Sequence, residues 1–244
     1  MVIVLEKIIN FRSLAKDKLN KNGKRIIPNT IFRSGILTFA SKKDLQKLKE
    51  LNIKYIYDFR SSDERQQLEE LNQNDFNIRH FDILKGTLTN QRTFKNLKTD
   101  AMLDEMLTLY GESLPKSLEY KKVIQEILKQ ETKEFVFHCS SGKDRTGVFG
   151  IILMLILDFN IQTIKEEYLT IEASSIEFMR HHFMTIFNVD NPKELDPLIT
   201  VFEEYFDIFI KVINKKYGST DNYLLKLGVS KEVKEKLIKI YCDL

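Results

Sequence analysis

Strand-like and helix-like segments alternate through the first two thirds of the chain, and this alternation limits the fold more than any other feature. Runs of β-branched and aromatic residues predict strands at Thr30–Arg33, Ile53–Asp58, Ile78–Ile83 and Glu134–His138. Apolar residues at helical spacing predict helices between them. Strands that alternate with helices are typical of an α/β fold with a central, mostly parallel sheet flanked by helices.

Helix-start signals support this layout. Ser41 and Asp44 form a capping-box pattern ahead of leucines at helical spacing, and Pro115 precedes a second apolar repeat. In the last third, Asp196 begins an apolar stripe that continues to Ile213, which predicts a long helix. We therefore expect the C-terminal portion, residues 196–244, to be helical.

The chain of 244 residues has no internal repeat and no Gly, Ser or Pro-rich linker. With 43% hydrophobic residues it can bury a core without disulfides, so we expect a single domain over residues 1–244. Residues 84–113 are long for a connection and hold one amphipathic stretch, 101–110. This segment is either a lid or an ordinary packed insertion.

Composition excludes several functional classes. A net charge of +3, from 38 basic and 35 acidic side chains, is too balanced to attract nucleic acid by itself. The longest apolar run, Val148–Leu157, has about half of the ~20 residues that a membrane-spanning helix needs, so we expect no stable membrane insertion. Two cysteines make no disulfide framework, and the histidines lack partners at metal-ligand spacing. We expect no metal and no cofactor.

The first residues are apolar but are cut short at Glu6, and no basic segment precedes them, so they do not resemble a secretory signal. We expect a cytoplasmic protein, with export by a route that needs no cleaved signal left open. The sequence carries no signal for an oligomeric state.

One segment carries recognisable chemistry: the strand ending at His138 runs into a polar loop and then an apolar helix. Five residues separate Cys139 from Arg145, which lets the loop wrap around a tetrahedral anion with its N–H groups inward and the helix N-terminus beneath. The same field favours the thiolate of Cys139, a nucleophile. The residues expected to bind phosphate or substrate are Ser140, Ser141, Gly142, Lys143, Thr146 and Gly147.

The loop predicts a two-step phosphoryl transfer through a cysteinyl-phosphate. The fork of Arg145 would hold two phosphoryl oxygens, and Thr146 would donate a hydrogen bond to the Cys139 sulfur. His138 is expected to be a buried supporting residue. Two carboxyl groups compete as general acid, and we expect them to share this role, with Asp58, at the end of a predicted strand, slightly ahead of Asp144. The alternative role of Asp58 is a structural cap or a partner of Arg60, and that of Asp144 is an ion pair that fixes the loop.

The loop resembles that of the Cys-x5-Arg protein tyrosine phosphatase superfamily, in particular the bacterial and fungal tyrosine/serine phosphatases with His-Cys-x-x-Gly-Lys-Asp-Arg-Thr-Gly, and residues 138–147 match it completely. Three further segments resemble that family in order: Asn10-Phe11-Arg12, Phe32-Arg33-Ser34-Gly35, and Asp58-Phe59-Arg60 with Glu64. The chain departs from the family at Ser13-Leu14-Ala15, where Asp-Leu-Gly is usual, and at Phe59, where Leu is usual.

The resemblance implies a metal-free phosphatase acting on phosphotyrosine, and also on phosphoserine, phosphothreonine and phosphoinositides. Its partners would be phosphorylated proteins or phosphoinositides, and Lys143 with Asp144 resembles loops that accept inositol phosphate head groups. Two alternatives stay open: a phosphoinositide-specific phosphatase, and a catalytically weak phosphate-binding module.

Overall fold

A computed structural model describes the placement of residues 3, 5–68, 71, 75–85, 99–187 and 191–243. At its centre lies a five-stranded sheet in the order β1-β3-β6-β4-β5. Its strands are β1 (Arg12–Ser13), β3 (Ile31–Ser34), β6 (Phe135–His138), β4 (Tyr55–Asp58) and β5 (Asn77–His80). β3, β6, β4 and β5 are parallel, and β1 pairs antiparallel with β3 at one edge. The predicted α/β fold with a mostly parallel sheet is confirmed.

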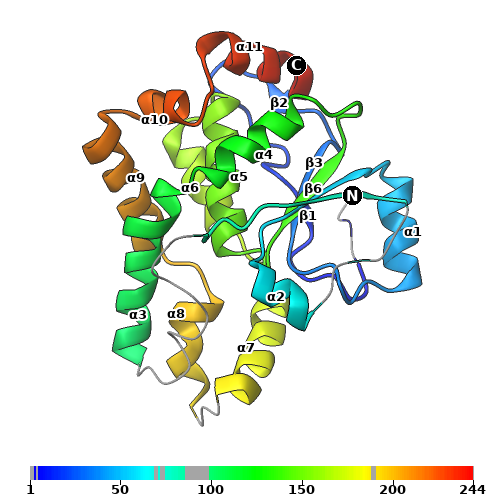
Figure 1. The fold of residues 1–244 in the computed structure, drawn as a ribbon, viewed down its shortest axis with the longest axis vertical. Helices are drawn as coiled ribbons and strands as arrows, with labels where there is room; N and C mark the ends of the chain where they lie inside the picture. Colours follow the sequence, from blue (N-terminus) through cyan, green and yellow to red (C-terminus); the bar gives the residue numbers. More distant parts are fainter. Residues whose placement is uncertain are drawn as a thin grey trace.

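Successive side chains of a strand point to opposite faces of the sheet and pack into two separate apolar clusters. Phe135 and Phe137 point to one face of the sheet, and Val136 between them points to the other. The Val136 face is covered by α1 (Lys42–Glu50), which buries Leu48 and starts at the predicted Ser41 capping box. Figure 1 shows α1 alone on one side of the sheet and most of the helices on the other.

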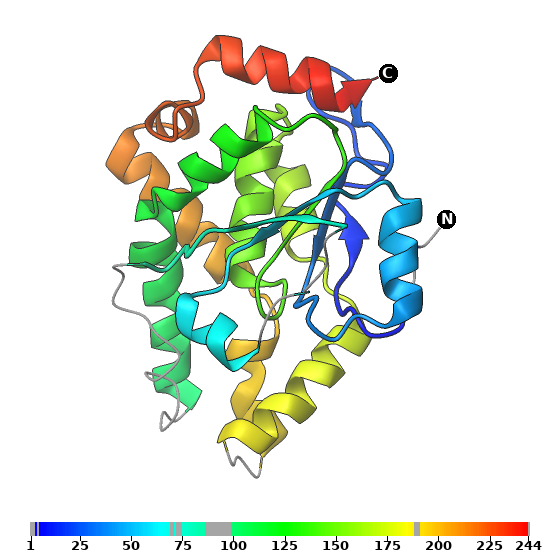
Figure 2. The same cartoon turned by 45° about the vertical axis from the view of Figure 1, so that its right-hand side comes forward.

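The larger cluster surrounds α5 (Asp144–Ile156), which is buried along nearly its whole length. This is the apolar run that the sequence predicts to be an internal helix. The helices around it are α4 (Glu119–Ile127), α6 (Ile161–Tyr168), α9 (Glu203–Tyr217), α10 (Thr220–Lys226) and α11 (Lys231–Tyr241). Figure 2 shows α11 crossing the end of the molecule to a two-stranded clasp, in which β7 (Cys242–Asp243) pairs with β2 (Arg25–Ile26).

The predicted continuous helix from Asp196 to Ile213 is wrong. The structure has α8 (Asp196–Ile199), a break at Thr200 and Phe202, which are extended, and then α9. The β-branched residues Ile199, Thr200 and Val201 disfavour a helix at the break. The new helix starts with two glutamates in its first turn, where the helix dipole favours negative charge.

The remaining helical segments are α2 (Ser62–Gln67), α3 (Thr99–Thr108), a π-helical turn (Leu109–Ser113), two 3-10 turns (Leu114–Lys116 and Pro192–Leu195) and α7 (Ala173–Phe187). In Figure 1, α2 and α7 lie near the end of the sheet where its parallel strands finish, and α3 runs beside α9. Within the candidate lid 84–113, residues 86–98 lie outside the described residues, and α3 packs against α8 and α9. A lid function stays a prediction. No helix in the described ranges is long and apolar enough to cross a membrane.

Candidate active site

The loop from Cys139 to Lys143 joins β6 to the start of α5, as the sequence predicts. Cys139 is 1% exposed and forms no disulfide. Gly142 has φ of 70°, and a Cβ there would come within 2.4 Å of the Ser34 carbonyl oxygen. The tight turn at Gly142 therefore requires glycine, both for its conformation and for the space.

The carbonyl groups of residues 140–142 are held on the outside of the loop. Ile36 N–H donates to the first at 2.9 Å, and Asn10 Nδ2 donates to the second and third at 3.4 and 3.1 Å. Arg33 Nη2 donates to the third at 3.0 Å. Within the described part of the chain, the N–H groups of residues 140–143 donate no hydrogen bond. Outward carbonyls and unused N–H groups are the arrangement that binds an anion.

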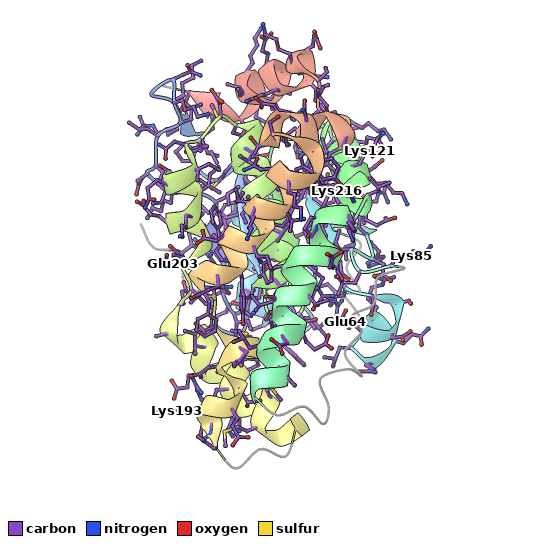
Figure 3. All side chains as sticks on the ribbon, turned by 90° about the vertical axis from the view of Figure 1, so that its left-hand side faces the viewer. Glu64, Lys85, Lys121, Lys193, Glu203 and Lys216 are labelled. Carbon is purple, nitrogen blue, oxygen red and sulfur yellow. The ribbon has the colours of Figure 1, made fainter. Side chains whose placement is uncertain are left out.

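The Arg145 guanidinium is held in place by Glu64 of α2. Nη1 lies 2.5 Å from Glu64 Oε2 and Nη2 lies 2.9 Å from Oε1, and the Ser140 hydroxyl also donates to Glu64. Among the described contacts of Arg145, its Nε makes none, which leaves an edge of the guanidinium for a ligand. Figure 3 shows Glu64 on α2, on the side of the molecule where α3 and α9 run next to each other.

The ion pair stabilises the charged forms of both groups, so it lowers the pKa of Glu64 and raises the pKa of Arg145. Burial raises the pKa of Glu64, but the facing charge of Arg145 and the hydrogen bonds from Arg145, Ser140 and the Ser61 N–H outweigh burial and lower it to about 2. Burial lowers the pKa of Arg145, and the charge and hydrogen bonds of Glu64 raise it above its usual range. Arg145 is thus a permanently charged, oriented donor beside the loop.

Lys143 and Asp144 bind each other. The Lys143 ammonium is buried, 2.6 Å from Asp144 Oδ1 and 5.9 Å from the centre of the Tyr205 ring on α9. The Tyr110 hydroxyl donates to the same carboxylate oxygen at 2.7 Å. Of the two roles that the sequence left open for Asp144, this geometry supports the ion pair that fixes the loop.

Asp58 lies at the centre of a buried polar cluster with Arg60, His80 and His138. It is 0% exposed, and its two carboxylate oxygens each accept a hydrogen bond from Arg60, from Nε and Nη2, at 3.0 Å. His80 Nδ1 lies 3.2 Å from Oδ2, and His138 Nε2 lies 3.8 Å from Oδ1. Burial raises the pKa of Asp58, but His138, His80 and Arg60 lower it well below its usual range. A carboxylate kept ionised and out of contact with solvent is poorly placed to donate a proton.

The chain is similar in sequence to known proteins along nearly its whole length. The model of the tyrosine phosphatase family matches residues 3–243. The chain belongs to the tyrosine phosphatase family. It is 28% identical over 228 residues to a Cupriavidus necator protein named as a tyrosine-protein phosphatase, a match over 91% of this chain and 82% of the relative. A tyrosine-protein phosphatase of Nostoc commune is 28% identical over 131 residues, which are 52% of this chain and 44% of that protein. The chain is a phosphatase, as the loop predicts.

Two solved structures are similar to the chain at lower sequence identity. The match to Pseudomonas aeruginosa TpbA covers 76% of this chain and 88% of the TpbA chain, at 16% identity and a TM-score of 0.34. The match to the catalytic core of the Saccharomyces cerevisiae PP-IP phosphatase Siw14 covers 80% of this chain and 94% of the Siw14 chain, at 15% identity and a TM-score of 0.38.

Three residues that flank the loop, His138, Thr146 and Gly147, were given roles from the sequence, and their surroundings in the structure differ. His138 is buried as expected, with Nδ1 3.2 Å from the Cys139 carbonyl oxygen. The predicted bond from Thr146 to the Cys139 sulfur is wrong here, because Thr146 Oγ1 is buried without a hydrogen-bond partner in the part of the chain described. Gly147, expected to bind phosphate, donates its N–H to the Lys143 carbonyl oxygen at 2.7 Å, and a Cβ there would lie 3.2 Å from the Tyr168 ring, so its phosphate contact stays a prediction.

Asp82 is a candidate site residue that the sequence analysis did not single out. The predicted strand Ile78–Ile83 ends already at His80, which places Asp82 in the turn just beyond the end of β5. Burial raises the pKa of Asp82, although the Leu84 N–H and the charge of Arg145 lower it in part. Its Oδ1 is buried and has no hydrogen-bond partner among the described residues. Ligands bind at this end of parallel strands, so the position of Asp82 after a strand was the available signal.

Proposed function

We propose that this phosphatase hydrolyses phosphate monoesters through a cysteinyl-phosphate intermediate, with phosphotyrosine as the main substrate. Phosphoserine, phosphothreonine and phosphoinositides are further substrates. The observation that best supports the proposal is the direction of the loop, with its carbonyl groups at 140–142 held outward and its N–H groups free around Cys139. The names of the two relatives support phosphotyrosine as the first choice.

In the first step, the Cys139 thiolate attacks phosphorus, the S–P bond forms, and the bond from phosphorus to the leaving oxygen breaks. The leaving oxygen takes a proton from a carboxylic acid. In the second step, the oxygen of water attacks phosphorus, its proton goes to that carboxylate, the S–P bond breaks, and inorganic phosphate is released. Arg145 and the loop N–H groups stabilise the charge on the transferred phosphoryl group in both steps.

The acid in this proposal is Asp82. A general acid needs a pKa raised towards the working pH and must reach the leaving group. Asp58 is ionised and enclosed by Arg60, and Asp144 is held by Lys143 and Tyr110. Asp82 combines a raised pKa, an unused oxygen and an electrostatic interaction with Arg145.

The first experiment measures phosphate release from a phosphotyrosine peptide, a phosphoserine peptide and a panel of phosphoinositides, with EDTA present. We expect fastest release from the phosphotyrosine peptide and none from the Cys139→Ser variant. Release that survives in Cys139→Ser would refute the cysteine mechanism. A folded wild-type protein that binds these substrates and releases nothing would be a phosphate-binding module.

The second experiment identifies the acid by varying the leaving group. Asp82→Asn is expected to lower kcat by about 10²-fold or more on an alkyl phosphate and much less on an aryl phosphate whose leaving group needs little protonation. Asp58→Asn and Asp144→Asn are the matched controls, and their losses should not depend on the leaving group. If Asp144→Asn shows that dependence and Asp82→Asn does not, the assignment to Asp82 is wrong.

A further inference from the structure

Behind the phosphate loop lies a second buried arginine, Arg33, which the mechanism above does not use. Arg33 is on β3 and is 2% exposed, and its Nη2 donates to the Gly142 carbonyl oxygen at 3.0 Å. This contact is on the side of the loop opposite to the free N–H groups. A guanidinium is costly to bury, so its place against the loop needs an explanation.

The first turns of α5 lie close to this guanidinium. A Cβ at Gly147 would lie 3.5 Å from Arg33 Nη2, and one at Gly150 would lie 3.4 Å from Nη1, both ordinary van der Waals distances. The two glycines are three residues apart and share one face of the helix. The guanidinium therefore lies against the helix that carries Arg145.

Arg33 shares its carboxylate partner with a second arginine. Glu167 is buried and pairs with both Arg33 and Arg12, at 3.8 and 3.4 Å. The Arg33 charge interacts with Arg12, Glu167, Cys139, Tyr110 and Tyr168, and Arg12 also interacts with Glu172. Burial and then Arg12 lower the pKa of Arg33 to about 9, while Glu167 and Cys139 raise it in part, so Arg33 is charged at neutral pH. Arg33 therefore places a positive charge next to the loop.

We propose that Arg33 is a positioning residue for the phosphatase site. Its hydrogen bond turns the Gly142 carbonyl outward and so keeps the loop N–H groups facing the phosphate. Its charge also acts on Cys139 behind the same loop. Asn10 supplies the second hydrogen bond to the same carbonyl, without a charge. The inference rests on the proposed function of the loop but does not depend on which ester is the substrate.

The test separates the two effects by three variants in a Cys242→Ser background, so that Cys139 is the cysteine that reacts. Arg33→Met removes the hydrogen bond and the charge, Arg33→Lys keeps a charge without the guanidinium fork, and Asn10→Ala removes the neutral hydrogen bond. The first readout is the pH dependence of Cys139 alkylation by iodoacetamide without substrate. The second is the affinity for inorganic phosphate, measured as competitive inhibition and by calorimetry.

We expect Arg33→Met to move the midpoint of the alkylation profile up by roughly one pH unit, as the loss of a nearby charge does. Phosphate affinity should fall about tenfold, the effect of one charge-assisted hydrogen bond. Arg33→Lys should keep the midpoint near that of the wild type and still lose phosphate affinity. Asn10→Ala should leave the midpoint unchanged and weaken phosphate binding by about threefold. Arg25→Met, at a half-exposed arginine in β2, is the control and should change neither readout.

A folded Arg33→Met protein with the alkylation midpoint and phosphate affinity of the wild type would overturn the proposal. If Arg33→Met does not fold, Arg33→Lys decides: wild-type phosphate affinity in that variant would refute the role of the guanidinium. Neither readout needs turnover. A wild-type protein that releases no phosphate from any ester would refute the proposed function while the alkylation profile still tests Arg33.

Discussion

The ion pair between Glu64 and Arg145 makes stability depend on pH in a way that a single variant can isolate. Glu64 is buried, and its pKa falls from 4.5 to about 2 in the folded protein. At about 1.4 kcal/mol for each pKa unit, ionised Glu64 contributes about 3 kcal/mol to the free energy of unfolding at pH 7. Because the folded pKa is the lower one, this contribution is complete above pH 4.5. It declines as the pH falls, to about 1 kcal/mol at pH 3.

The perturbation is Glu64→Gln, which keeps the size of the side chain and removes its charge. Urea unfolding of the variant and the wild type is measured at several pH values between 3 and 7, where all other groups titrate alike in both proteins. We expect the variant to be less stable by about 3 kcal/mol at pH 7, with the difference shrinking to about 1 kcal/mol at pH 3. Glu50→Gln, on the exposed side of α1, should shift stability by less than about 0.5 kcal/mol at every pH.

Activity provides a second check of the same pair. Without Glu64, the Arg145 guanidinium keeps its charge but loses the two contacts that orient it, so kcat should fall by about tenfold or more at pH 7. A stability difference that stays constant from pH 7 to pH 3, or that is below about 1 kcal/mol at pH 7, would refute the reasoning.

Three further outcomes are expected. Gly142→Ala should destabilise the protein by about 2–4 kcal/mol in urea unfolding and abolish phosphate binding, since its Cβ meets the Ser34 carbonyl group at a positive φ; a stable, active variant would contradict the geometry of the loop. Tyr110→Phe should cost about 1 kcal/mol and lower kcat/KM severalfold by freeing Asp144; unchanged unfolding and kinetics would mean that Lys143 alone fixes this carboxylate. Excess EDTA should leave turnover unchanged. Activity that is lost with EDTA and restored by a divalent cation would show that the Cys139 thiolate does not carry the reaction without a metal.

The sequence predicted the features that depend on local pattern. The four parallel strands and the capping box at Ser41 were found because short apolar runs and cap residues act within a few positions. The phosphate loop was found because all of its groups lie between Cys139 and Gly147. Asp82, by contrast, fell inside the predicted strand and was not considered as a site residue. The strand ends two residues after Ile78, and propensity does not mark where a strand stops pairing.

A different physical reason speaks against the preference for Asp58 as the general acid. The end of a parallel strand is the right place for a functional side chain, but position alone does not say whether that side chain is free. Arg60, two residues later, folds back onto both oxygens of Asp58 and makes it a structural anion. Similarly, the contacts of Asn10 and Arg33 with Gly142 span more than one hundred positions, and no periodicity encodes them.

Charge balance explains why the loop needs support from such distant residues. Three acid–base pairs around the loop are already neutral: Asp58 with Arg60, Glu64 with Arg145, and Asp144 with Lys143. A phosphate monoester and the Cys139 thiolate bring further negative charge, and none of these pairs has a surplus to meet it. Besides the hydrogen bonds of Arg145, the compensation comes from the loop N–H groups, the N-terminus of α5 and the Arg33 guanidinium, which shares Glu167 with Arg12. Arg33 contributes to two of these sources, because it both orients the N–H groups through Gly142 and carries the charge, and its loss should therefore cost more than the loss of Asn10.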